Sequence, residues 1–186
     1  EAIKSAYSGG LNHFGENFLQ EAEPKIRALD LTPCWHFIGS IQSKKAKKIS
    51  SLFEWVHTVD RIKVAKKLDK FRPEGLGKLN ICIQVNPDKD LNKSGIALEE
   101  TEEFISELQA YKMLRVRGLM AIPKETKDQI QQRKVFAKIR NQFEDLKVTF
   151  PELDTLSMGM SGDFKAAILE GATMIRLGTL IFGERK

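Results

Sequence analysis

Two glycine-containing segments near the C-terminus hold the residues whose types and spacing best suit chemistry. Residues 156–163 read LSMGMSGD, and residues 174–183 read MIRLGTLIFG. Each segment is a small-residue turn at the end of an apolar stretch, where free backbone N–H groups can point at an anion. Arg176 adds a lone cation to the second stretch. Together the two segments predict a phosphate cradle with a charged contact to the rest of the ligand.

Other interpretations of the same residues stay open at this point. The glycines could serve only as tight turns, and Arg176 could merely bridge to a buried carboxylate. His36 and His57, each taken alone, are more typical of core or rim histidines than of catalytic groups. We therefore interpret His57 as structural and retain His36 only through the motif described below.

The bulk composition excludes several classes of protein. The chain has 186 residues, 30% of them charged, which fits one globular domain. No apolar run approaches a transmembrane helix, and no signal-peptide pattern is present. Cys34 and Cys82 stand at unrelated spacing, so we expect neither a disulfide framework nor a zinc site, and we expect a reducing, cytoplasmic setting.

The net charge of +5 is modest and favours anionic ligands in general. The best candidate for nucleic-acid binding is the lysine run at residues 44–48. It has no interleaved aromatic residues, so a solvated helix face explains it better. We therefore expect no nucleic-acid and no membrane partner.

Strand-like and helix-like segments alternate along the chain. Several of the strands are apolar almost throughout, which is typical of parallel strands covered by helices on both faces. Strands are predicted at residues 12–17, 35–39, 55–60, 80–86, 117–122, 155–161 and 174–182. Helices are predicted at residues 18–28, 44–51, 61–71, 97–111, 127–150 and 163–170.

The start of the chain indicates the architecture. Residues 1–8 read as the back half of a helix that stops at Gly9 and Gly10. A helix there should follow a strand, so the pattern is one strand short of a (β/α)8 barrel. We predict an α/β fold of this TIM-barrel type with its first strand missing from the chain, forming one N-terminally incomplete domain over residues 1–186.

Such a barrel gathers its functional residues at the carboxyl ends of its strands. Residues at or near those ends are Asn17, His36, Asp60, Asn86, Met120, Ser161 and Gly178. Strand alternation should place Ser157, Gly159 and Ser161 on one face, and Arg176 and Gly178 on one face of the last strand.

Six motifs give the chain a resemblance to a known family. It resembles the pyridoxal 5′-phosphate homeostasis proteins, which are similar to the barrel domain of alanine racemase. The motifs are FGENF at residues 14–18, WHFIGSIQSK at 35–44, KSG at 93–95, GLM at 118–120, SMGMS at 157–161 and RLGT at 176–179. They occur in the family's order over nearly the whole chain. The resemblance implies a barrel that binds pyridoxal phosphate as its cofactor.

The resemblance also implies roles for individual residues. Arg176 would face the pyridine nitrogen, where a cation does not favour a protonated ring and so weakens the ring as an electron sink. Asn17 and His36 would line the pocket near the ring, and Met120 would pack beside it. The phosphate would be held by Ser157, Ser161, Gly178 and Thr179.

Two lysines need separate treatment. The family's Schiff-base lysine lies on the first strand, upstream of Glu1, and Lys4 is too close to the FGENF motif to replace it, so we assign no catalytic residue. Lys93 follows a strand in a loop, where an exposed lysine is the usual interpretation. Its motif position also allows a role at the barrel mouth, either neutralising the phosphate or acting as a secondary acceptor of the aldehyde.

Two functions remain from different classes. In the first, a monomeric protein binds pyridoxal phosphate, buffers it and delivers it to apo-enzymes without catalytic turnover. The alternative is a pyridoxal-phosphate-dependent enzyme such as an amino-acid racemase. Alanine racemase takes a second acid/base residue from an additional β domain, whereas this sequence ends at Lys186 just after its last strand. We therefore favour the first function and leave enzymatic activity uncertain.

Overall fold

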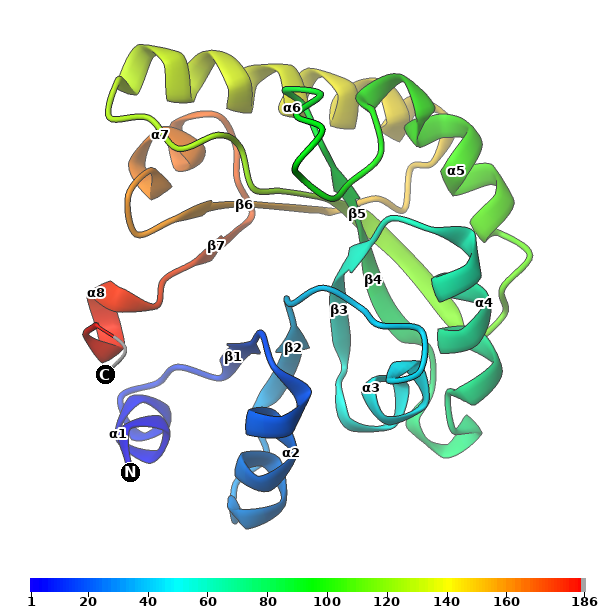
Figure 1. Cartoon of the computed structure of the whole chain (residues 1–186), viewed down its shortest axis with the longest axis vertical. Helices are drawn as coiled ribbons and strands as arrows, with labels where there is room; N and C mark the ends of the chain where they lie inside the picture. Colours follow the sequence, from blue (N-terminus) through cyan, green and yellow to red (C-terminus); the bar gives the residue numbers. More distant parts are fainter. Residues whose placement is uncertain (185–186) are drawn as a thin grey trace.

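Seven parallel strands form one sheet in which each strand pairs with the next along the chain (Figure 1). The computed structural model describes residues 1–184. The sheet curls into a near-closed barrel whose two edge strands are β1 and β7, which are not paired with each other within the described residues. The strands are β1 (His13–Glu16), β2 (Cys34–Phe37), β3 (Trp55–Val59), β4 (Leu79–Val85), β5 (Leu114–Ala121), β6 (Thr155–Met160) and β7 (Met174–Arg176).

Helices connect successive strands and cover the outside of the sheet (Figure 1). They are α1 (Ala2–Ser8), α2 (Leu19–Ala28), α3 (Ala46–Leu52), α4 (Ile62–Phe71), α5 (Thr101–Leu108), α6 (Gln129–Thr149), α7 (Phe164–Leu169) and α8 (Thr179–Phe182), with short 3-10 turns at Glu74–Leu76 and Leu98–Glu100. The long α6 begins where the Asp128 carboxylate accepts a hydrogen bond from the Ile130 N–H at 2.9 Å. Helix α1 confirms the helix expected at the start of the chain.

Strands β3, β4 and β6 are buried on both faces, as their apolar runs predict, whereas the edge strand β1 alternates between exposed and buried residues and β7 is only partly buried. On β4, Ile81, Ile83 and Val85 belong to the large core between sheet and helices, whereas Cys82 points into the barrel. There Cys82 packs with Trp55 and Met120 in a smaller inner cluster. Because β4 alternates between two buried layers, it tolerates apolar residues at almost every position.

The last predicted strand is too long. Strand β7 ends at Arg176, and Thr179–Phe182 form helix α8 with Gly178 as its N-cap residue. The apolar, β-prone residues after Thr179 suggested a strand, but the glycine at the N-cap position allows the backbone to turn into a helix. Arg176 and Gly178 therefore do not share a strand face.

Strand β6 also departs from simple alternation. The pairing register between β6 and β7 shifts between Ser157 and Met160, and Gly159 has a φ of +95°. A Cβ atom on Gly159 would lie 2.6 Å from the Cβ of Ala167 on α7. The glycine therefore lets α7 approach β6 closely, and the face expected for Ser157 does not continue regularly to Ser161.

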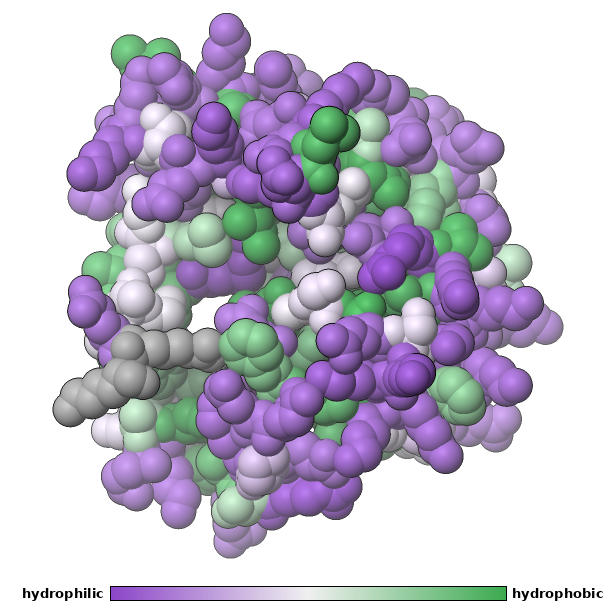
Figure 2. All heavy atoms as spheres, viewed as in Figure 1, coloured by the Kyte–Doolittle hydropathy of each residue, from purple (hydrophilic) through white to green (hydrophobic). Residues whose placement is uncertain are grey.

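The surface bears on the predicted partners. No helix among residues 1–184 is long and apolar enough to cross a membrane. In the lysine run, Lys48 pairs with Glu23 of α2 at 2.8 Å. Figure 2 shows a largely hydrophilic face with a hollow between the part of the molecule that carries β7 and the part that carries β1.

Candidate functional site

Arg176, the last residue of β7, connects this strand to the end of β5 and the middle of β6. Its Nη1 donates hydrogen bonds to Ser157 Oγ at 2.7 Å and to the Ser157 carbonyl oxygen at 2.8 Å. Its Nη2 donates to the Ala121 carbonyl oxygen at 2.9 Å. Residues of β5, β6 and β7 thereby hold the guanidinium in one position.

The Arg176 guanidinium keeps donors available for a ligand. A guanidinium has five N–H groups, and within residues 1–184 the Arg176 guanidinium donates three hydrogen bonds. Burial lowers the pKa of Arg176 to about 10, against the raising influence of Cys82 and Asp163. Arg176 is therefore a cation at neutral pH with N–H groups still free to donate.

A chain of histidines extends from Ser157 across the inside of the barrel. Ser157 Oγ lies 2.9 Å from His57 Nδ1, and His57 Nε2 lies 2.8 Å from His36 Nδ1. His36 Nε2 lies 2.9 Å from His13 Nδ1. We call this hydrogen-bonded series, from Arg176 through Ser157, His57 and His36 to His13, the histidine relay.

The chemistry of its members gives the relay a direction. Burial, followed by the charge of His13, lowers the pKa of His36 to about 3, and burial also lowers the pKa of His57 well below its ordinary value. Each is a neutral imidazole, with one donor nitrogen and one acceptor nitrogen. Arg176 can only donate to Ser157, so the Ser157 hydroxyl uses its hydrogen toward His57, the remaining neighbour.

His57 Nδ1 therefore accepts a hydrogen bond from the Ser157 hydroxyl. A neutral imidazole that accepts at one nitrogen carries its hydrogen on the other, and this rule fixes the next two hydrogen bonds. His57 donates from Nε2 to His36, and His36 donates from Nε2 to His13. The reverse direction would leave the buried Ser157 hydroxyl hydrogen without an acceptor among the described residues, at a cost of about 1–3 kcal/mol. The relay therefore runs from Arg176 toward His13.

The two predicted phosphate turns lie at the same end of the sheet as Arg176. Ser161 and Gly162 follow β6, whose Met160 pairs in register with Arg176. Gly178 and Thr179 begin α8, whose first backbone N–H groups have no partner inside the helix. A Cβ atom on Gly162 or Gly178 would meet no atom of residues 1–184 within 4 Å, so open space borders both turns in this part of the chain.

The remaining predicted residues lie around this group at different distances. Met120 is fully buried on β5 and pairs in register with Ser157. His36 reaches Ser157 only through His57. Asn17 follows β1, on the other side of the open seam, and its carbonyl oxygen packs against Gly39. The structure thus brings Arg176, Ser157 and Met120 together, whereas Asn17 stands apart.

Lys93 lies at the mouth of the barrel. Its Nζ donates to the carbonyl oxygen of Ile122 at 3.1 Å, one residue beyond the Ala121 carbonyl that Arg176 contacts. This position places a second cation near the carboxyl end of β5.

The sequence did not single out His13 and His57 as members of this network. Both lie on the inner face of strands next to His36, so their connection depends on strand register. The signal was the presence of a histidine on each of three consecutive strands. Without the register, that signal could not be distinguished from isolated core histidines.

The fold and site define the class of the protein. The sequence model of the family described as "Alanine racemase, N-terminal domain" matches residues 1–186. The pyridoxal phosphate homeostasis protein of Pseudomonas aeruginosa is 49% identical over 185 residues, which cover 99% of this chain and 79% of that protein. That of Escherichia coli K12 is 44% identical over 188 residues, 99% of this chain and 80% of that protein.

Solved structures agree with this assignment. PipY of Synechococcus elongatus without pyridoxal phosphate superposes with a TM-score of 0.90 at 38% identity, covering 98% of this chain and 86% of PipY. The structure of PipY with pyridoxal phosphate bound superposes with a TM-score of 0.88 at 37% identity and the same coverage. The chain therefore belongs to the pyridoxal phosphate homeostasis protein family, and its fold is an alanine-racemase-like barrel.

Proposed function

We propose that this chain binds pyridoxal 5′-phosphate reversibly, buffers it and delivers it to enzymes that need it. The observation that carries the proposal is Arg176, a cation anchored by Ser157 and Ala121 with N–H donors left over, beside two turns bordered by open space. The names of the relatives and the pyridoxal phosphate bound in PipY support the choice of ligand.

The residues present suit the two ends of this cofactor. Backbone N–H groups of the Ser161–Gly162 and Gly178–Thr179 turns, together with the hydroxyls of Ser161 and Thr179, offer donors to a phosphate. Arg176 offers N–H donors to the pyridine nitrogen. Met120 supplies an apolar surface on the inner wall of the barrel.

Arg176 would influence the electronic state of the bound cofactor. Bound pyridoxal phosphate supplies an aldehyde for amines and a pyridine ring able to withdraw electrons. Arg176 remains a cation at neutral pH and donates, so it disfavours a proton on the ring nitrogen. An unprotonated ring withdraws electrons weakly, so Arg176 reduces the ability of the bound cofactor to act as an electron sink.

Titration of the purified chain with pyridoxal phosphate, followed by absorbance and calorimetry, tests the proposal. Arg176→Gln should weaken binding roughly 10- to 100-fold, corresponding to about 1.5–3 kcal/mol for a lost hydrogen bond from a charged group. Arg115→Gln removes an exposed arginine of β5 and is the matched control, with unchanged binding expected.

Absence of binding by the unaltered chain, or equal affinity of the two variants, would contradict the proposal. Interconversion of alanine enantiomers at enzyme-like rates would favour the racemase alternative instead. Transfer of bound cofactor to an added apo-enzyme, faster than its release into buffer, is the result expected of a delivery protein.

We also propose that the chain acts in the cytoplasm as a monomer. Both cysteines are free thiols, which suits a reducing compartment. Sedimentation of the protein across a range of concentrations tests the oligomeric state, and a mass equal to one chain throughout is the expected result.

A further inference from the structure

Three potential metal ligands meet near the amino-terminal ends of β1 and β2. His13 and Cys34 are direct register partners across these two strands, and His36 follows Cys34 by two residues on the same strand face. His13 Nδ1 or Nε2, Cys34 Sγ and a ring nitrogen of His36 all lie within 4.8 Å of one another. The cysteine spacing in the sequence gave no metal motif, because strand pairing creates this cluster.

We propose that His13, Cys34 and His36 form a binding site for a thiophilic divalent cation of the zinc class. Two imidazole nitrogens and one thiolate are ligands that zinc prefers, and a water molecule can fill the fourth position of a tetrahedral site. This cation site includes His36, which the family resemblance places near the cofactor ring, but its ligands come from β1 and β2, and it does not depend on the proposed function.

The geometry requires only small movements. Tetrahedral coordination at typical zinc–nitrogen lengths separates two nitrogen ligands by about 3.3 Å and a nitrogen from a sulfur by about 3.5 Å. His13 Nδ1 and His36 Nε2 lie 2.9 Å apart and already face each other. The cation would replace the hydrogen bond between these nitrogens, which would move apart by about 0.4 Å, and it would lie beside the line that joins them, on the side of Cys34 Sγ.

The surroundings of Cys34 suit a cation. The part of the chain that the structure describes provides no hydrogen bond to its thiol, which leaves the sulfur available as a ligand. Burial, and then the carboxylate of Glu54, raises the pKa of Cys34 to about 11. The carboxylate that disfavours a bare thiolate also offsets part of the charge of an incoming divalent cation.

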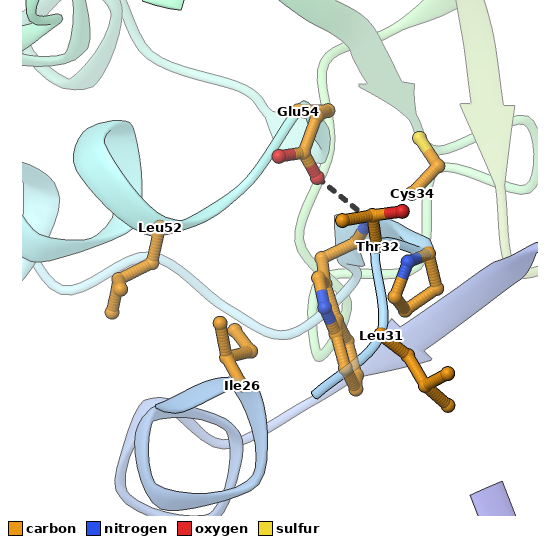
Figure 3. Close-up of a pocket in the computed structure, with 8 residues that line it drawn as sticks. Ile26, Leu31, Thr32, Cys34, Leu52 and Glu54 are labelled. Carbon is orange, nitrogen blue, oxygen red and sulfur yellow. Dashed lines mark hydrogen bonds between the residues drawn. The ribbon is translucent and has the colours of Figure 1, made fainter. Parts of the chain in front are cut away.

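Solvent reaches the proposed site through its exposed members. Cys34 and Glu54 line a pocket of about 410 Å³ beside α2, together with Ile26, Leu31 and Leu52 (Figure 3). The Cys34 sulfur points away from Ile26 and Leu52, and Cys34 packs against the inner cluster of the barrel. Because His13 is exposed and Cys34 is partly exposed, an ion can reach the three side chains without crossing the core.

Coordination has a defined proton balance. The Cys34 thiol loses its proton to solvent as the sulfur–metal bond forms. His13 already presents the lone pair of Nδ1, whereas His36 must move its proton from Nε2 to Nδ1 in order to coordinate through Nε2. His36 Nδ1 faces His57 Nε2, so His57 must in turn carry its proton on Nδ1, toward Ser157.

Cation binding therefore reverses the histidine relay. In the reversed state, Ser157 Oγ accepts from both Arg176 and His57, and its hydroxyl hydrogen turns away from His57. This reversal gives a readout at His57, which is not itself a ligand of the cation.

Cobalt(II) is a suitable probe, titrated into the chain free of pyridoxal phosphate and of other metals. We expect binding of one ion per chain, a thiolate-to-cobalt charge-transfer band and the visible bands of tetrahedral cobalt. Cys34→Ser should lose the charge-transfer band, and His13→Gln should weaken binding at least roughly tenfold. Cys82→Ala, which removes the chain's other cysteine, should retain the band.

Nitrogen NMR of the zinc-loaded chain supplies the second readout, in which His57 should change from the Nε2–H to the Nδ1–H form. No thiolate band in the unaltered chain, a band that persists in Cys34→Ser, or its loss from folded Cys82→Ala would overturn the site. An unchanged form of His57 in the loaded chain would overturn coordination by His36. Circular dichroism checks each variant for folding, and His13 is exposed, so His13→Gln tests the site without disturbing the core.

Discussion

The guanidinium of Arg176 and the hydroxyl of Ser157 are joined by a hydrogen bond of 2.7 Å between β7 and β6. Ser157 is fully buried and also contacts His57, so it connects the proposed cofactor pocket to the histidine relay. The position of the Arg176 guanidinium therefore depends on its hydrogen bond to the buried Ser157. This dependence can be tested directly.

Ser157→Ala should weaken pyridoxal phosphate binding about three- to tenfold. The variant removes one of the hydrogen bonds that orient Arg176, and a typical hydrogen bond contributes about 1 kcal/mol. Calorimetric titration measures the effect. Ser106→Ala removes an exposed hydroxyl of α5 that bonds only to its own helix, and it should bind like the unaltered chain. Equal affinity of both variants would show that Ser157 does not position Arg176.

The direction of the relay predicts the form of each histidine. In the metal-free chain at neutral pH, His36 and His57 should both carry their hydrogen on Nε2, because Arg176 can only donate to Ser157. Nitrogen chemical shifts of labelled histidine report this directly, with a chelator present. An Nδ1–H form at His57 would mean that the relay runs the other way.

The sequence predicted most of the fold because of how parallel strands are buried. Runs such as that at residues 79–85 are mostly apolar, as expected of buried parallel strands, and helical patterns lie between them, so the seven strands were identified in order. The prediction was wrong after Arg176, where β-prone residues form helix α8. The strand propensity of residues 179–182 does not decide their conformation, because the backbone turns at Gly178, the N-cap residue of α8.

The site was harder to predict than the fold. Arg176 and Ser157 could be placed within the last two strands from the apolar pattern, and the family resemblance assigned both to the pocket. Their direct contact, and the connection to His57 and His13, depend on register shifts such as the one between Ser157 and Met160. The sequence does not encode such irregularities in any local pattern, so His57 was interpreted only as structural.

Gly39→Ala should destabilise the protein by about 2–4 kcal/mol. A Cβ atom at this position would overlap the carbonyl oxygen of Asn17, a backbone atom that cannot rotate away. Urea denaturation measures the free energy of unfolding. Gly75→Ala is the matched control, because a Cβ there meets no atom within 4 Å, and its stability should change by less than about 1 kcal/mol. Similar stability of the two variants would rule out the close approach of Gly39 to Asn17.

The ion pair between Asp154 and Arg117 should make a small, pH-dependent contribution to stability. Partial burial raises the pKa of Asp154, but the hydrogen bonds from Arg117 and Thr155 have the larger combined effect. The pKa of Asp154 therefore lies below the ordinary value of an aspartate. A carboxylate whose pKa is lowered by folding stabilises the folded state at pH values above its pKa in the unfolded chain. This contribution is lost as the pH falls through its pKa in the folded protein. Because Asp154 is about half exposed, we expect roughly 0.5 kcal/mol.

Urea denaturation of Asp154→Asn at several pH values checks this expectation. The variant should be less stable than the unaltered chain at pH 7, and the difference should vanish in acid. Asp145→Asn, at an exposed position on α6, should show no such trend. A difference that grows as the pH falls would contradict the assigned direction of the shift.

A crystal structure of this chain grown with pyridoxal 5′-phosphate tests the central claim most directly. We expect the phosphate beside Ser161, Gly178 and Thr179 at the carboxyl ends of β6 and β7, with the pyridine nitrogen facing Arg176. Cofactor bound elsewhere on the chain, or a pyridine ring turned away from Arg176, would contradict it.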